Sequence, residues 1–263
     1  MNLQLKNKRV FISGSTSGIG LATATLFTKE GAEVIINGRS EKTIHTAIKK
    51  IKNKNPDALV SGIVADFKNK ESVNNLIEQL TEIDILINNV GIYTSQEFNK
   101  TSDSDWLDMF EVNVMSAVRL SRGLLANMID QNWGRIINIS SECAQLVPED
   151  LIAYSTTKTA LLGLSRGLAQ LTKETAVTVN AVLPGSTLSE GAKEFLEVQA
   201  KKNNTSPQLE ANDFFKNIRT SSLIQRFATT DEIANIILFL ASPLAAAING
   251  ASIKADGGSI GGI

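Results

Sequence analysis

The stretch V-F-I-S-G-S-T-S-G-I-G occupies residues 10–20, and a helical pattern follows it directly. Its apolar start predicts a buried strand, and its glycines follow with the spacing Gly-x-x-x-Gly-x-Gly. The first glycine permits a tight turn, while the later two let backbone approach a pyrophosphate and let the helix pack closely. The N–H groups and positive dipole end of that helix would then face the phosphates. Strand, glycine turn and helix in this order predict a dinucleotide site, with contacts from Gly14, Ser15, Ser17, Gly18, Ile19 and Gly20.

Short apolar runs alternate with longer helical patterns along the chain. The runs are nearly continuous in Val, Ile and Leu, as expected for parallel strands covered on both faces; they are Val10–Ser13, Val34–Asn37, Leu59–Ala65, Ile83–Asn88, Arg135–Ser140, Val177–Leu183 and Ala251–Ala255. Amphipathic stretches predict helices at Glu41–Lys52 and Lys70–Leu80, and longer ones near Asp103–Gln131 and Leu151–Lys173. The alternation predicts an α/β fold: one Rossmann-like domain over residues 1–263, a doubly wound parallel sheet of about seven strands with helices on both faces.

The alternation of strand and helix patterns is interrupted between Leu188 and Phe227, where no strand is predicted. Lys201–Pro207 resembles a polar turn or loop, and the rest predicts short helices with apolar faces. A long insertion beyond the carboxyl end of a strand is where lids usually lie, so residues 188–227 are predicted to cover a substrate pocket. The alternative is an excursion that merely packs on the domain.

The composition argues against several classes of partner. Twenty-six Lys and Arg against 27 Asp and Glu leave no basic surplus for a nucleic acid. The single cysteine, Cys143, cannot form an intramolecular disulfide, which favours a reducing cytoplasm. The sequence shows no apolar signal core, so export is not predicted. It has no run of roughly 18 apolar residues, so no membrane span is predicted. The single histidine, His45, lies in a polar stretch, so no metal site is predicted.

The end of the second strand indicates which dinucleotide is bound. A cofactor without a 2′-phosphate is usually held there by an acidic residue, yet residues 37–40 are Asn-Gly-Arg-Ser. Arg39 would instead form charge-assisted bonds with a 2′-phosphate, helped by Ser40. NADP(H) is therefore predicted over NAD(H). In the alternative, Arg39 is a solvated loop residue.

Tyr154 and Lys158 stand four residues apart in a helical pattern, shortly after the strand that ends near Ser140-Ser141. They share a helix face and can point into one crevice. Carbonyl reduction needs an acid for the substrate oxygen, and a free tyrosine with a pKa near ~10 is poorly matched to neutral pH. An ammonium about 4 Å away at an effective dielectric of about 20 would stabilise the phenolate by roughly 4 kcal/mol. The pair therefore predicts an acid–base centre in which Lys158 lowers the pKa of Tyr154.

Together these motifs resemble the short-chain dehydrogenase/reductase family, in its single-domain branch. The resemblance spans nearly the whole chain, with Ser13–Gly20, Asn88-Asn89-Val90-Gly91, Asn113, Ser141, Tyr154/Lys158, Pro184-Gly185 and Asp256-Gly257-Gly258 in the family's order. The 13-residue step to Tyr154 selects Ser141 over Ser140. Ser13 and Val90 depart from the common threonine and alanine. The chain as a whole is similar to reductases labelled 3-oxoacyl-carrier-protein reductase-like.

The resemblance implies a role for each matched residue. Tyr154 would be the general acid in reduction and the base in oxidation, Lys158 would also hold the nicotinamide ribose, and Ser141 would bond the substrate oxygen. Asn113 would hold a relay water. The cofactor would further contact Asp66 and Phe67 at the adenine, Asn89 and Gly91 at the ribose side, and Pro184, Gly185 and Thr187 at the nicotinamide.

Structural alternatives remain for several of these residues. In these alternatives, the role of each residue is structural: Asn113 would only cap or kink its helix, Asp66 would cap a turn, and Asn88 would tie neighbouring strands together. At the level of function, the leading hypothesis is hydride transfer between NADP(H) and a small carbonyl or alcohol. The alternatives are a catalytically idle dinucleotide sensor or scaffold, and a nicotinamide-dependent isomerase or dehydratase.

The substrate pocket and the oligomeric state are less clearly marked. Leu146, Val147, Leu151 and Leu188 suggest an apolar pocket wall, and Glu142, Glu149 and Asp150 would disfavour an anionic substrate if they face inward. Apolar residues lie on much of the circumference of the helix near Leu151–Lys173, including Leu161, Leu162, Leu164 and Leu168. That is more than one sheet face needs, so a homotetramer or homodimer is predicted.

Overall fold

The computed structural model describes residues 1–262, which form a seven-stranded parallel sheet with the order β3-β2-β1-β4-β5-β6-β7. The strands are β1 (Arg9–Ile12), β2 (Glu33–Gly38), β3 (Val60–Val64), β4 (Ile85–Asn88), β5 (Gly134–Ile139), β6 (Val177–Pro184) and β7 (Ser252–Ala255). The predicted doubly wound, Rossmann-like sheet is confirmed. The chain builds β1 to β3 outward, then returns to place β4 beside β1. The carboxyl ends of β1 and β4 therefore form the switch point at which such sheets bind ligands.

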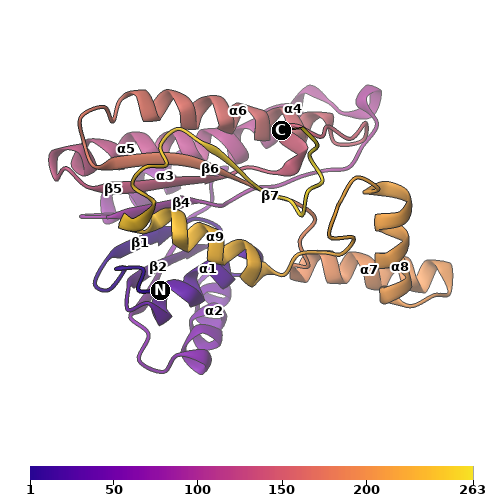
Figure 1. The fold of residues 1–263 in the computed structure, drawn as a ribbon, viewed down its shortest axis with the longest axis horizontal. Coiled ribbons are helices and arrows are strands. Elements are labelled where there is room, and N and C mark those ends of the chain that lie inside the picture. Colours follow the sequence, from indigo (N-terminus) through magenta and orange to yellow (C-terminus); the bar gives the residue numbers. More distant parts are fainter. Residues whose placement is uncertain (263) are drawn as a thin grey trace.

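Helices cover both faces of the sheet, as Figure 1 shows. One face carries α1 (Gly18–Lys29), α2 (Glu41–Lys54) and α9 (Thr230–Ala241); the other carries α3 (Lys70–Gln79), α4 (Asp103–Phe110), α5 (Ser116–Asp130) and α6 (Ile152–Gln170). Alternate strand residues serve the two cores: Val10 and Ile12 pack with α1 and α9, whereas Phe11 packs with residues of α3 and α5. Strands buried on both faces need apolar residues at every position, which explains the continuous runs in the sequence.

The helix predicted near Asp103–Gln131 is interrupted. A π-helical turn, Glu111–Met115, separates α4 from α5 and contains Asn113 at its centre. The Asn113 side chain bonds backbone outside the helix, and such π-turns often occur at functional positions. The hydrophobic periodicity of these 29 residues does not reveal the one extra residue that a π-helical turn contains.

Residues 188–227, all of them described, form no strand of the sheet. They form α7 (Glu190–Asn203), α8 (Pro207–Asp213) and a π-helical turn, Phe214–Ile218, and they project beside the sheet at the right of Figure 1. We call residues 188–227 the lid segment after the predicted role, and coverage of a substrate pocket by them remains a prediction. The predicted polar loop Lys201–Pro207 is wrong at its start, because α7 continues to Asn203. The helix stops at Asn204, which is left-handed with φ 53°, and Ser206 caps α8.

Within residues 1–262, no helix is both long and apolar enough to cross a membrane. The same residues bring together no group of three or more His, Cys, Asp or Glu side chains able to hold a metal ion.

Candidate active site

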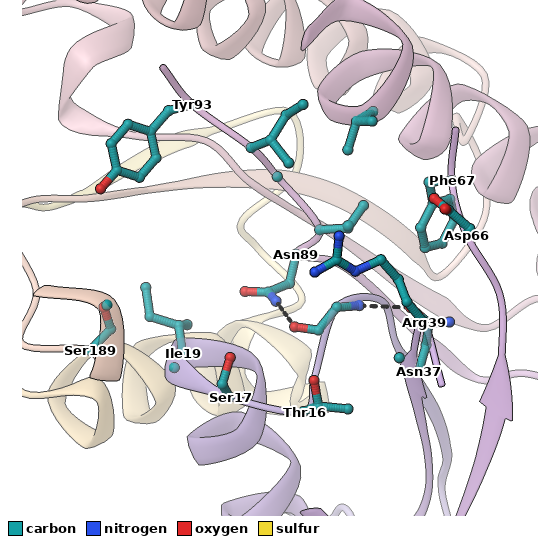
Figure 2. A pocket seen from close by; sticks show the side chains of 18 of the residues that line it. Thr16, Ser17, Ile19, Asn37, Arg39, Asp66, Phe67, Asn89, Tyr93 and Ser189 are labelled. Carbon is teal, nitrogen blue, oxygen red and sulfur yellow. Dashed lines mark hydrogen bonds between the residues drawn. The ribbon is translucent and has the colours of Figure 1, made fainter. Parts of the chain in front are cut away.

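A cavity of about 580 Å³ lies where the strand order reverses. The glycine turn forms one wall, the ends of β2, β3 and β4 form the other, and residues 189–191 of the lid segment close one side. Figure 2 shows Ser17 and Ile19 on the turn, Arg39, Asp66 and Phe67 toward one end, and Tyr93 toward the other. The cavity is thus an elongated groove that begins at Arg39 and runs past the N-terminus of α1.

A smaller cavity of about 200 Å³ continues the groove and shares Ile19, Asn89 and Gly91 with it. Its lining adds residues predicted for chemistry and for the nicotinamide end, namely Ser141, Tyr154, Lys158, Pro184 and Gly185, whereas Thr187 lines both cavities. The fold therefore brings β1, β4, β5, β6 and α6 to one place, and places the candidate cofactor residues next to the candidate catalytic residues.

The glycine turn is packed against the segment that follows β4. Gly14 has φ +59°, and a Cβ there would lie 2.9 Å from the Val90 Cα. The Ser13 hydroxyl accepts hydrogen bonds from the N–H groups of Asn89 at 2.9 Å and Val90 at 3.1 Å. Serine at position 13 keeps the hydroxyl that threonine would supply, so this departure from the family pattern leaves the packing intact.

Lys158 is buried on α6, and its ammonium donates to the Ile139 carbonyl at 2.9 Å, where β5 ends. The Lys158 Nζ lies 5.6 Å from the centroid of the Tyr154 ring, on the same helix face. The Ser141 hydroxyl accepts from Cys143 N–H at 3.1 Å, whereas Ser140 donates its hydroxyl to the Lys158 carbonyl at 2.8 Å. Both serines line the smaller cavity, but the Ser140 hydroxyl is used to brace α6.

A model of the short chain dehydrogenase family matches residues 8–200. The chain belongs to this family. It is 46% identical over 263 residues to the uncharacterized oxidoreductase YvrD of Bacillus subtilis, covering 99% of each chain. It is 33% identical to the 3-oxoacyl-[acyl-carrier-protein] reductase FabG of Aquifex aeolicus, covering 98% of this chain and 99% of that one.

Among solved structures, the fold superposes on L-sorbose reductase from Gluconobacter frateurii complexed with NADPH and L-sorbose. The TM-score is 0.93, with 31% identity and full coverage of both chains. The resemblance to the family that the sequence indicated is confirmed. Because an acyl-carrier-protein reductase and a sugar reductase are both relatives, membership alone does not select a substrate.

Within this short chain dehydrogenase, burial dominates the titration of the candidate catalytic pair, Tyr154 and Lys158. Burial raises the pKa of Tyr154 above its ordinary value of 10.0, and a side-chain hydrogen bond with Ser141 acts in the other direction. Burial also lowers the pKa of Lys158 from 10.5 to about 8. The sequence predicted that Lys158 would lower the pKa of Tyr154; in the structure the pKa of the phenol shifts upward, because removal from water outweighs the hydrogen bond with Ser141, and Cys143, Tyr93 and Glu142 add to the upward shift.

Asn113 is held by three hydrogen bonds from its side-chain amide. Its Oδ1 accepts from Ile92 N–H at 2.7 Å, and its Nδ2 donates to the Ile92 carbonyl at 2.9 Å and to the Thr157 hydroxyl at 3.0 Å. The space facing Gly91 is bounded by both Lys158 Nζ and Asn113 Oδ1. Asn113 thus joins the segment after β4, the π-turn and α6 around the ammonium, and the relay water remains a prediction.

Three predicted cofactor contacts do not line the cavity. The buried Ser15 hydroxyl donates to the Ile12 carbonyl at 2.6 Å and accepts from Asn37 N–H at 2.9 Å. Gly20 packs against Gly14 and Asn89, where a Cβ would lie 2.6 Å from the Asn89 amide nitrogen. Ser40 caps α2 through Thr43 N–H at 3.4 Å. These residues shape the turn and strand ends rather than line the groove.

At the adenine end, Asp66 and Phe67 both line the cavity, with Phe67 buried. The Asp66 carboxylate also accepts from Lys68 N–H at 3.0 Å, so the turn-capping alternative is realised as well. Asn88 donates to Asn138 at 2.8 Å across β4 and β5, the strand tie weighed against a cofactor contact.

Sequence reasoning missed several residues of the groove. Thr16 and Asn37 line it, and the Asn37 amide oxygen accepts from Gly14 N–H at 3.0 Å. A polar residue that ends an apolar strand run is the signal that marks Asn37. Glu190 also lines the groove, and its carboxylate accepts from Gly18 N–H at 2.8 Å across 172 residues of chain. No local sequence pattern predicts that contact.

Proposed function

We propose that this chain is an NADP(H)-dependent oxidoreductase that transfers hydride between the nicotinamide and a carbonyl or secondary alcohol substrate. The observation that carries the proposal is the continuous groove from Arg39, past the glycine turn, to Ser141, Tyr154 and Lys158. L-sorbose reductase, the relative with the same fold, was solved with NADPH. That likeness supports the same cofactor here.

The groove suits a dinucleotide phosphate on its own geometry. A carboxylate oxygen of Glu190 already accepts the Gly18 N–H at the N-terminus of α1, which is where a pyrophosphate oxygen would be held. Arg39 would hold the 2′-phosphate, and Asp66 with Phe67 would flank the adenine. Asn89, Gly91 and Lys158 would meet the nicotinamide ribose, and Pro184, Gly185 and Thr187 would line the ring and its carboxamide.

Residues of this chain would donate the proton to the substrate oxygen and accept it in the reverse direction. When bound, the reduced nicotinamide supplies the hydride and the oxidised ring accepts it. Burial keeps the Tyr154 phenol protonated at neutral pH, the form that a general acid needs for reduction. Ser141 would orient the substrate oxygen beside that phenol.

Lys158 matters most in the direction of oxidation, where Tyr154 must first release its proton. An ammonium 5.6 Å from the ring centroid favours the phenolate by about 3 kcal/mol at an effective dielectric of about 20. The same cation would hold the ribose hydroxyls. The Lys158 side chain would thus both position the cofactor and lower the cost of forming the Tyr154 phenolate.

The test is a turnover screen of the purified protein. NADPH with a panel of ketones and aldehydes, and NADP+ with secondary alcohols, should reveal substrates that consume cofactor in equal amounts with product. Cofactor binding without turnover across the panel would contradict the proposal in favour of a sensor. Substrate conversion without net NADPH oxidation would contradict it in favour of an isomerase or dehydratase.

A further inference from the structure

A buried ion pair joins the loop of Ser141 to the lid segment. The Arg219 Nε donates to Glu142 Oε1 at 2.8 Å, and the two side chains are 11% and 4% exposed. Glu142 directly follows Ser141 and opens the 3₁₀ turn Glu142–Ala144. The Ser186 hydroxyl donates to the same Oε1 at 3.2 Å. One carboxylate therefore links three segments that each border the proposed catalytic centre.

The Arg219 end of this pair is fixed by packing. Arg219 N–H donates to the Phe214 carbonyl at 2.8 Å, and its guanidinium lies 5.9 Å from the centroid of the Phe214 ring. Phe214, Phe215 and Phe227 pack together with ring centroids 5.0 to 5.2 Å apart. The lid segment therefore presents the guanidinium from a braced position rather than on a free side chain.

The Glu142 end depends on Arg219. Its other oxygen, Oε2, is buried without a hydrogen-bond partner, so the charge is compensated on one side alone. A buried ion pair adds little stability over apolar residues of similar size, yet loss of one partner strands the other charge. The stability of the fold therefore does not require the Glu142–Arg219 ion pair. The position of the loop that carries Ser141 does depend on it.

The geometry points to Arg219 as a positioning residue that acts through Glu142 to set Ser141 and Tyr154 for proton transfer. This inference rests on the proposed function and deepens it. The Ser141 hydroxyl accepts Cys143 N–H at 3.1 Å within the same turn that Glu142 opens, so a displaced Glu142 would move the serine. The charge of Glu142 also acts to raise the pKa of Tyr154, together with Cys143 and Tyr93. Arg219 offsets that charge.

The experiment compares Arg219→Gln, Arg219→Lys and the double variant Glu142→Gln/Arg219→Gln with the parent enzyme. Arg219→Gln should lower kcat about 10²-fold, the loss expected for a misplacement on the order of 1 Å, while the Kd for NADPH changes less than about two-fold. Its pH profile for alcohol oxidation should move to higher pH, because the unpaired carboxylate opposes the phenolate. Arg219→Lys should recover part of kcat.

The matched control is Arg226→Gln. Arg226 pairs with Glu232 at 2.7 Å near the end of the lid segment, but these side chains are 54% and 46% exposed. Its kcat should stay within about two-fold of the parent. The double variant leaves no buried charge unpaired, so it should fold even if Arg219→Gln does not, and its kcat should remain low. A double variant with parental kcat, or Arg219→Gln with kcat and pH profile unchanged, would overturn the inference.

A readout without substrate separates this inference from the proposed function. In Arg219→Gln, amide hydrogen exchange should rise at residues 143–146 and stay unchanged in β1, β4 and β5. If the parent protein reduces no carbonyl, the proposed function fails, while faster exchange confined to the serine loop still supports the positional link. Unchanged exchange at residues 143–146 counts against the link whatever the activity.

Discussion

Lys158 holds a positive charge where water is excluded, and that burial has a thermodynamic consequence. Its pKa falls from 10.5 to about 8, so below pH 8 the ammonium is charged in both folded and unfolded chains and its burial costs roughly 3 kcal/mol. Between pH 8 and 10.5 the unfolded chain alone is charged. The cost therefore disappears as pH rises through that window.

Replacement of this lysine by an apolar residue should stabilise the cofactor-free protein. Lys158→Met is expected to raise the free energy of unfolding at pH 7 by up to roughly 3 kcal/mol, with the gain shrinking toward zero by about pH 10.5. Urea unfolding of both proteins at the two pH values measures this difference, and the comparison with the parent isolates Lys158 from other titrating groups. A variant less stable than the parent at pH 7 would contradict the account.

Arg39 is exposed at the end of β2 and lines the adenine end of the groove. If it meets the 2′-phosphate, Arg39→Gln should weaken NADPH binding about ten-fold or more, since bonds to charged groups contribute about 1.5–3 kcal/mol. NADH has no 2′-phosphate, so its Kd serves as the internal control and should hardly change. Equal losses for the two cofactors would assign Arg39 to the solvated alternative.

At this scale, local spacing predicted the glycine turn and the Tyr154/Lys158 pair, and the family resemblance selected Ser141. The glycine turn, Ser141, Tyr154 and Lys158 all lie where strand ends and one helix face place them. Glu190 and Arg219 were not predicted, because their partners are 172 and 77 residues away and are met through folding of the lid segment. The upward pKa of Tyr154 was missed because the sequence carries no measure of burial.

Among the helices of the lid segment, α7 lines the groove directly. Glu190 in its first turn accepts the Gly18 N–H of α1, and although partial burial raises its pKa, hydrogen bonds from its own N–H and that of Gly18 keep the pKa below the usual value. The carboxylate is therefore charged at neutral pH. It occupies a position that suits a pyrophosphate oxygen.

Removal of this charge should favour the cofactor. Glu190→Gln is expected to tighten NADPH binding by roughly two- to five-fold, from the 0.3–1 kcal/mol that an exposed anion contributes at a helix N-terminus. Fluorescence titration measures the Kd, and Glu194→Gln, the same change one turn further along α7, is the control. Weaker NADPH binding in Glu190→Gln would show that the carboxylate assists the cofactor instead.

Strands were easier to predict than helices. Double-sided burial gives the central strands an unmistakable apolar run, and the predicted ends of all seven strands agree with the structure to within about two residues. The π-turn around Asn113 and the extension of α7 to Asn203 depend on tertiary contacts and on a left-handed cap at Asn204. Neither leaves a periodic signal.

At the scale of the whole molecule, the outer surface of α4 and α6 is unusually apolar. Leu107 is 70% exposed and Phe110 is 39% exposed on α4, and Leu162, Leu164 and Leu168 on α6 are partly exposed. Leu161 by contrast is buried within the subunit, so part of the predicted excess serves the domain core. The remaining surface favours association of like chains.

We therefore expect two or four chains per particle in solution. Light scattering should report twice or four times the mass of one chain, and Leu107→Asp should lower that mass, because a charge within an apolar interface is costly. The exposed Leu209→Asp change on α8 is the control at a distance from α4 and α6. A monomeric parent protein would contradict this expectation.

The whole account depends on proton transfer by the partly buried phenol of Tyr154 beside the proposed nicotinamide site. The most direct measurement is single-turnover reduction of the best carbonyl substrate by Tyr154→Phe with saturating NADPH, alongside the Kd for NADPH. Loss of the general acid should slow the hydride step by about 10²- to 10⁴-fold with the Kd nearly unchanged. A rate equal to that of the parent would contradict the mechanism.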